Sequence, residues 1–244
     1  MMQALAQAPV PAPHADPLSI KGFLETSFVD WPGKVVSVLF LPRCNFRCPF
    51  CHNHSLVVNP AGYDDIPRPY IMARLTELKE WVDGVCISGG EPTIHPRLPS
   101  LMAEVKELGL TVKLDTNGSR PDILQALLAQ GLVDCVAMDI KAPLDEVSYA
   151  RAAGTAVDLA AIQESIALLE KGEVEYYFRT TVVPALHKGE DLLHIARHLS
   201  GSSSLTLQNF NAEDPLDPRF KGAASYHAEW LQGMQERITP IIQQ

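Results

Sequence analysis

The chain has 244 residues, 46% of them hydrophobic, and its 20 basic and 29 acidic side chains give a net charge of −9 at neutral pH. This length suits one complete barrel or two small domains, and the composition is that of an ordinary globular protein. Because the charge is negative and no apolar stretch approaches the roughly 18 residues of a membrane-spanning helix, we expect neither nucleic acid nor a membrane as a partner.

The first residues, 1–17, are rich in Ala, Pro and Gln and are predicted to form a disordered leader. They contain no Lys or Arg and no sustained apolar core, so they lack the pattern of a signal peptide. We therefore expect a cytoplasmic protein with a single folded domain over residues 18–244 that ends in a helix.

Short β-rich runs and longer helical patterns alternate along the rest of the chain. The runs predict strands at 35–41, 84–87, 111–115, 133–140, 174–183 and 204–210. The helical patterns lie at 69–82, 96–108, 121–130, 159–171 and 190–199, with a last one near 223–237. This alternation predicts an α/β fold with a parallel sheet, either an open doubly wound sheet or part of a (β/α) barrel.

Polar motifs follow the predicted strands, where ligands collect in both of these architectures. Taken singly, each motif is also compatible with a plain turn or a surface ion pair. Together they predict a ligand site on one rim of the sheet, formed by Ser88, Gly89, Gly90, Glu91, Asp115, Thr116, Asn117, Asp139, Lys141 and Arg179.

A loop with three cysteines follows the first predicted strand. Cys44, Cys48 and Cys51 have the spacing C-x3-C-x2-C. A cubane iron–sulfur cluster has four irons to ligate, so three thiolates would leave one iron without a protein ligand. An open metal position is where chemistry takes place, whereas closed sites are usually structural.

Other interpretations of these cysteines remain open at this point. The same cysteines with His52 or His54 could form a closed zinc site. The signature C-x-x-C-H of c-type haem is also present, but haem attachment requires an exported chain. An odd count of five cysteines argues against disulfides, and Cys86 and Cys135 lie in apolar runs that predict burial in the core.

With these motifs in place, the chain resembles the radical S-adenosylmethionine (SAM) enzymes. Phe50 precedes the third cysteine, and Gly89-Gly90-Glu91 occupies the position of the SAM-binding glycine motif of that family. The run 22–34 and the segment Cys51-His52-Asn53 are similar to those of the activating proteins of anaerobic ribonucleotide reductase and related glycyl-radical activases. His54 departs from the family pattern, since relatives often have proline there, and a loop without that proline has a freer φ angle.

The resemblance covers about residues 20–210 and implies a partial (β/α)6 TIM-type barrel of the radical SAM type. It also implies a [4Fe-4S] cluster on Cys44, Cys48 and Cys51, with SAM on the fourth iron. Reductive cleavage of SAM would yield methionine and a 5′-deoxyadenosyl radical, so no catalytic side chain is expected beyond the cluster and SAM.

The resemblance also assigns roles to the rim residues. Backbone groups of Ser88, Gly89 and Gly90, with the Glu91 carboxylate, would receive the SAM ammonium, and Gly90→Val is expected to weaken SAM binding while sparing the cluster. Asp115, Thr116 and Asn117 would lie near the ribose and carboxylate of SAM, and Lys141 and Arg179 would bind its carboxylate. One histidine, His187 or His194, would contact its nucleoside. Asp115, Thr116 and Asp139 would also be ligands of a monovalent cation.

The resemblance implies an enzyme that generates a glycyl radical on a partner, with anaerobic ribonucleoside-triphosphate reductase as the expected partner and a flavodoxin- or ferredoxin-type protein as electron donor. A radical SAM enzyme of the 7-carboxy-7-deazaguanine synthase type, acting on a small molecule, is the first alternative. A zinc- or cluster-stabilised interaction module without catalytic activity is the second.

Overall fold

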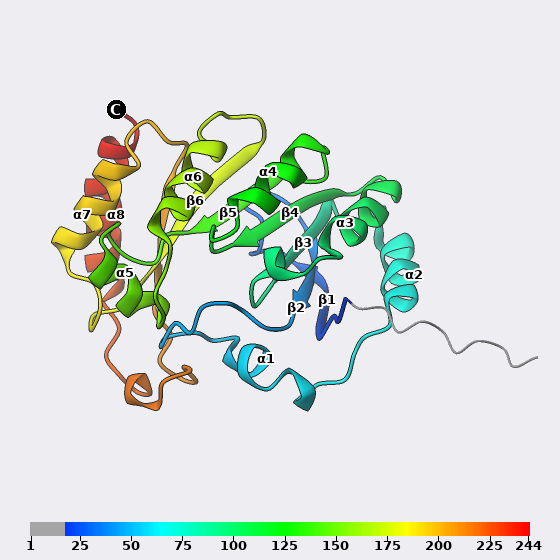
Figure 1. Ribbon diagram of the computed structural model, residues 1–244, viewed down its shortest axis with the longest axis horizontal. Helices are drawn as coiled ribbons and strands as arrows, with labels where there is room; N and C mark the ends of the chain where they lie inside the picture. The colour runs from blue at the N-terminus through cyan, green and yellow to red at the C-terminus, as the bar shows by residue number, and fades with distance from the viewer. Residues whose placement is uncertain (1–17) are drawn as a thin grey trace, which may run out of the picture.

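The computed structural model describes residues 18–244, so the predicted leader lies outside the described residues (Figure 1). One sheet contains the strands β1 (Gly22–Ser27), β2 (Val36–Leu41), β3 (Gly84–Gly89), β4 (Thr111–Thr116), β5 (Cys135–Asp139), β6 (Glu175–Val182) and β7 (Leu205–Asn209). The helices are α1 (His54–Val58), α2 (Arg68–Leu78), α3 (Leu98–Glu107), α4 (Pro121–Ala129), α5 (Glu146–Ala153), α6 (Leu159–Leu169), α7 (Gly189–His198) and α8 (Ala228–Ile242). Within residues 18–244, none of these helices is long and apolar enough to span a membrane.

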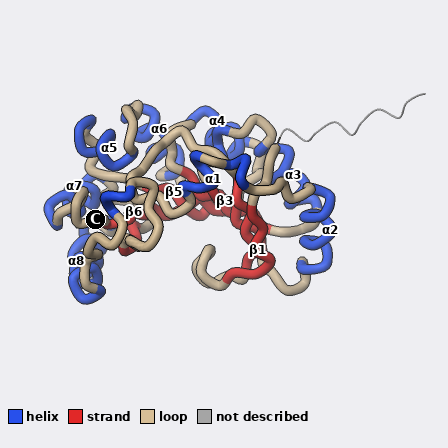
Figure 2. Tube along the Cα trace, turned by 90° about the horizontal axis from the view of Figure 1, so that it is seen from below, coloured by secondary structure: helices blue, strands red, loops and turns tan. Residues whose placement is uncertain are grey.

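The order of the strands decides between the two predicted architectures. The strands β2 to β7 are parallel and lie side by side in the order in which they occur along the chain. A doubly wound sheet reverses its strand order at a switch point, whereas an unbroken order with right-handed crossovers puts every helix on the same face. Figure 2 shows this result, a curved sheet with helices along its outer face. In the described residues β7 pairs only with β6 and β1 only with β2, so the barrel is partial, as predicted.

All six predicted strands are present with ends within two residues of the prediction, but β1 was missed. It pairs antiparallel with β2, and its side chains alternate between partly buried and exposed positions. A strand of this kind at the edge of a sheet needs no strongly apolar face, so its sequence gives little periodic signal. The helices α1 and α5 were missed because they have only 5 and 8 residues.

The two faces of the sheet bury different residues. Side chains on the outer face, such as Leu39, Ile87 and Phe178, pack against the helices in the main core. The inner face has a separate apolar cluster formed by Trp31, Val36, Val38, Cys86 and Cys135, with Trp31 supplied by the segment between β1 and β2. Cys86 and Cys135 are therefore core residues, as predicted, and this cluster leaves the carboxyl ends of the strands free for polar side chains.

Candidate active site

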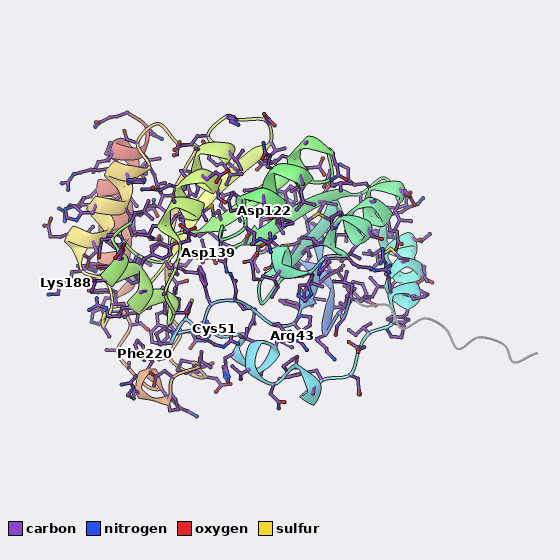
Figure 3. The ribbon with its side chains drawn as sticks, viewed as in Figure 1. Arg43, Cys51, Asp122, Asp139, Lys188 and Phe220 are labelled. Atoms are coloured by element: carbon purple, nitrogen blue, oxygen red, sulfur yellow. The ribbon has the colours of Figure 1, made fainter. Side chains whose placement is uncertain are left out.

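The predicted rim residues meet in a single cavity of about 430 Å³. Figure 3 marks two of its residues, Cys51 on the loop after β2 and Asp139 at the end of β5. His194 is not one of the lining residues, because it lies on the exposed side of α7. The cavity is lined by thirteen of the fourteen residues predicted from the sequence: Cys44, Cys48, Cys51, Ser88, Gly89, Gly90, Glu91, Asp115, Thr116, Asn117, Asp139, Lys141 and Arg179.

The cysteine loop is held by hydrogen bonds from several elements. Arg43 turns the chain out of β2 with a φ of 63°, and it is the single non-glycine residue with a positive φ among the described residues. Its N–H donates to the Leu56 carbonyl at 2.9 Å, and the Arg47 N–H donates to the Ala153 carbonyl at the end of α5 at 2.7 Å. Contacts within the protein therefore hold the loop in a defined conformation.

The three thiols suit a metal cluster. Burial raises the pKa of Cys44 and of Cys48 to about 11, and it also raises the pKa of Cys51. Metal ligation requires the thiolate, so binding must displace these protons. The Phe46 N–H and the Asn117 amide, 3.3 and 3.8 Å from the Cys44 sulfur, are donors that stabilise a thiolate there. The residues present thus fit a cluster held by Cys44, Cys48 and Cys51.

His52 and His54, the proposed fourth ligands of a zinc site, contact another segment. The Nε2 atom of His52 lies 2.7 Å from the Asn211 carbonyl oxygen, and that of His54 lies 3.1 Å from the Asp214 carboxylate. These contacts join the cysteine loop and α1 to the chain after β7. His54, which stands where relatives often have proline, therefore has a structural partner of its own.

The glycine motif packs against the cysteine loop. A Cβ atom on Gly90 would lie 1.6 Å from the Arg43 carbonyl oxygen, and one on Gly89 would lie 2.3 Å from the Leu41 carbonyl oxygen. The N–H groups of Gly90 and Glu91 donate to these two carbonyls, to Leu41 and Arg43 respectively, both at 2.8 Å. Because the new side chain of Gly90→Val would displace the backbone next to Cys44, we expect this substitution to disturb the cluster loop as well as SAM binding.

The Glu91 carboxylate has protein partners that were not predicted from the sequence. It accepts hydrogen bonds from the Thr93 hydroxyl at 2.6 Å, the Thr116 hydroxyl at 2.7 Å and the Asn117 N–H at 2.7 Å. The side chain is buried, and burial raises its pKa despite these donors. The Thr93 N–H is a fourth donor at 3.1 Å, and these four donors compete with the SAM ammonium for the acceptor sites of the carboxylate. Through its contacts with Thr116 and Asn117, Glu91 connects the end of β4 to the glycine motif.

A row of alternating charges crosses the cavity wall, and its first member, Lys113, was missed from the sequence. The Lys113 ammonium, which is fully buried, pairs with Asp115. Arg179 contacts Asp115 at 3.3 Å and Asp139 at 2.9 Å, and Lys141 contacts Asp139 at 2.9 Å. Burial favours the neutral acids, but the cations outweigh it, lowering the pKa of Asp115 and holding that of Asp139 at about 2.

Two asparagines that were given no role from the sequence, Asn45 and Asn53, connect the cysteine loop to neighbouring motifs. Asn45 accepts a hydrogen bond from the Asn117 side chain at 2.9 Å and donates one to the Ser119 hydroxyl at 2.7 Å. Asn53 donates to the Gly89 carbonyl at 3.1 Å. The available signal was their position, since Asn45 lies inside the loop and Asn53 lies two residues after its last cysteine.

His187 contacts the backbone of the site and not its cavity. Its Nδ1 accepts a hydrogen bond from the Val183 N–H at 3.0 Å, so the proton sits on Nε2, which donates to the Lys141 carbonyl at 2.7 Å. The ring is fully buried, and burial lowers its pKa. His187 therefore positions the backbone of Lys141, and neither His187 nor His194 lines the cavity.

Comparison with known proteins now identifies the family. Residues 38–200, more than half of the chain, match the profile of the Radical SAM superfamily. The chain belongs to this superfamily. Its cofactors are therefore a [4Fe-4S] cluster and SAM, which supply one-electron cleavage of a C–S bond when bound. The alternative of a non-catalytic module is wrong.

The relatives define the family more narrowly. A provisionally named glycyl-radical enzyme activating enzyme of Methanocaldococcus jannaschii is 32% identical, over 83% of this chain and 84% of that protein. A pyruvate formate-lyase-activating enzyme of Clostridium pasteurianum is 29% identical, over 65% and 66% of the two chains. A 7-carboxy-7-deazaguanine synthase of Methanopyrus kandleri is 30% identical, over 52% and 55%. The first of these matches places the chain in the glycyl-radical activase family.

Solved structures show the same fold. SuiB of Streptococcus suis, bound to its precursor peptide SuiA, superimposes with a TM-score of 0.65 at 16% identity. The match covers 83% of this chain and 44% of SuiB, so this chain spans less than half of that protein. At this identity the likeness concerns the barrel alone.

Proposed function

We propose that this radical SAM enzyme removes a hydrogen atom from a glycine of a partner protein and so leaves a glycyl radical on it. The proposed partner is anaerobic ribonucleoside-triphosphate reductase, and the proposed electron donor is a flavodoxin- or ferredoxin-type protein of the cytoplasm. The proposal includes the predicted roles of the cavity residues toward SAM, except that Glu91 connects the end of β4 to the glycine motif.

The extent of the alignments carries this proposal. The glycyl-radical activase match extends over 83% of this chain, whereas the 7-carboxy-7-deazaguanine synthase match extends over 52%. The size of the cavity agrees with it. One drug-sized ligand occupies a pocket of about 300–1,000 Å³, so a cavity of about 430 Å³ that must hold SAM beside the cluster has little space for a second whole molecule. A protein substrate can instead insert a short segment from outside.

Electron paramagnetic resonance tests the proposal directly. The anaerobically reconstituted, reduced enzyme is incubated with SAM and the purified reductase, and the expected result is a glycyl radical signal on the reductase. The Cys48→Ala enzyme is the control, and it should give no signal because it lacks a cluster ligand.

The same samples test the small-molecule alternative. If the enzyme cleaves SAM but produces no glycyl signal with the reductase or with any other glycyl-radical enzyme of its host, the proposed activity is wrong. A parallel reaction that contains the substrate of the 7-carboxy-7-deazaguanine synthases in place of the reductase would then identify the alternative, if mass spectrometry detects their product.

A further inference from the structure

The carboxylates of Asp115 and Asp139 lie on adjacent strands at the inner wall of the cavity, and both are largely buried. All four of their oxygens contact protein donors. One Asp115 oxygen contacts Lys113, and the other contacts Ser88 at 3.0 Å and Arg179 at 3.3 Å. One Asp139 oxygen contacts Arg179 and the other contacts Lys141, each at 2.9 Å.

Arg179 is the residue that joins the two acids. It sits on β6 directly opposite Asp139 of β5, so the parallel register brings its guanidinium beside that carboxylate. Nε donates to Asp139 and Nη1 donates to Asp115. A planar guanidinium suits this position better than a point charge because its donors diverge in fixed directions.

Thr116, the third oxygen ligand expected for a monovalent cation, is also engaged. Its hydroxyl donates to Glu91 at 2.7 Å and accepts the Gly118 N–H at 3.1 Å. Every side-chain oxygen of the three expected ligands therefore already contacts a protein donor, with which a metal ion would have to compete.

The charges of the row lead to the same conclusion. Three cations, Lys113, Arg179 and Lys141, surround two carboxylates, so the row already carries a net charge of +1. Adding a metal ion would place a further positive charge among buried cations, where Coulomb repulsion is stronger than in water. Removing Arg179 would instead leave two carboxylates facing each other with one cation each.

We propose that Arg179 takes the place of a monovalent metal ion in this protein, so that its site assembles and binds SAM without K⁺ or Na⁺. This inference concerns the binding of the cofactor and holds whatever the hydrogen donor is. Its failure and that of the proposed function are therefore distinguishable.

The test compares potassium chloride, sodium chloride and choline chloride at equal ionic strength. With the anaerobically reconstituted wild-type enzyme, the dissociation constant of SAM should agree within about twofold in all three salts, since choline is too large to replace a small ion among carboxylates. An affinity that is several-fold weaker in choline would overturn the proposal.

Two substitutions at Arg179 sharpen the test. Arg179→Met keeps most of the bulk but removes the charge, and it should weaken SAM binding about tenfold or more in choline, with partial recovery in K⁺ or Na⁺. Arg179→Lys keeps a cation and should show no dependence on the salt. If Arg179→Met binds SAM equally in all three salts, the guanidinium does not stand in for an ion. Arg197→Met, on the exposed side of α7, is the matched control and should behave as the wild type.

Thermal unfolding of the cluster-free proteins gives a second readout that does not depend on cofactor loading. The melting temperature of wild-type protein should be the same in the three salts, and that of Arg179→Met should be higher in K⁺ or Na⁺ than in choline. A wild-type melting temperature that rises specifically with K⁺ or Na⁺ would contradict the proposal. If Arg179→Met does not fold, the wild-type and Arg179→Lys measurements still decide the matter.

Discussion

The inner face of the barrel has two regions, a lower one towards the amino ends of the strands and an upper one towards their carboxyl ends. Towards the amino ends, Val38, Cys86 and Cys135 pack around Trp31 in an apolar cluster. Towards the carboxyl ends, the same strand faces present polar and charged side chains, with Ser88 two residues after Cys86 on β3 and Asp115 two residues after Lys113 on β4. The comparison shows that one face of one sheet can supply stability at one end and chemistry at the other.

Cys48→Ala should have the largest effect in the upper region, because it removes one of three cluster ligands. We expect the reconstituted protein to lose its iron and its brown colour, where the wild type binds about four irons per chain. The matched variant in the lower region is Cys86→Ala, which should retain the cluster because Cys86 packs in the apolar cluster. Iron analysis and the visible absorption spectrum measure both. A full iron content in Cys48→Ala would refute the ligand assignment.

Trp31→Ala should have the largest effect in the lower region. Trp31 is fully buried, and truncating a buried Trp to Ala costs about 3–5 kcal/mol of the free energy of unfolding. Trp81, which is 80% exposed, is the control, and Trp81→Ala should change the free energy by less than about 0.5 kcal/mol. Urea unfolding of the two cluster-free variants tests this difference, and equal losses would contradict the central place of Trp31 in the apolar cluster.

Lys113→Met should have an intermediate effect, because Lys113 links the two regions. Its ammonium is fully buried and pairs with Asp115, which keeps Arg179 and Ser88 as partners after the substitution. We expect a loss of about 2 kcal/mol in the free energy of unfolding, below the usual cost of breaking a buried pair. Adding Asp115→Asn should recover part of this loss, and the double-mutant cycle measures the coupling. Additive effects of the two substitutions would show that the pair contributes nothing.

His187→Gln should have the smallest effect and one that depends on pH. Burial lowers the pKa of His187 below its ordinary value of 6.5, so the folded protein favours the neutral ring. Its contribution to stability is therefore complete above pH 6.5 and is lost as the pH falls through the lowered pKa. Between pH 7.5 and 5.5, His187→Gln should lose less stability than the wild type in urea unfolding. His194→Gln, on the exposed side of α7, should match the wild type. An unchanged pH dependence in His187→Gln would exclude this role.

The sequence predicted the residues of the site better than it predicted their contacts. Cys44, Gly89, Asp115 and Asp139 belong to motifs that are local in the chain, and the six parallel strands bring them to one rim. The role of Glu91 could not be predicted, because its partners Thr116 and Asn117 come from a different strand end and depend on the fold.

The alternation of strand and helix patterns predicted the α/β class, whereas the partial barrel was implied by the family resemblance and not by the hydrophobic pattern. Periodicity is the same in a barrel and in a doubly wound sheet, so strand order had to decide between them. Lys113 was overlooked for a related reason. Lys113 lies between the buried Val112 and Leu114, and in such an alternating pattern a lysine is expected to face solvent. Only the curvature of the sheet turns this face inward.

The tight packing of the glycine motif on the cysteine loop has a consequence for protein engineering. Since the Arg43 carbonyl occupies the space that a side chain on Gly90 would need, the loop cannot be grafted onto another barrel as an independent cassette. A recipient scaffold would also require a glycine at the equivalent point of the neighbouring strand, and both segments would have to be transplanted together.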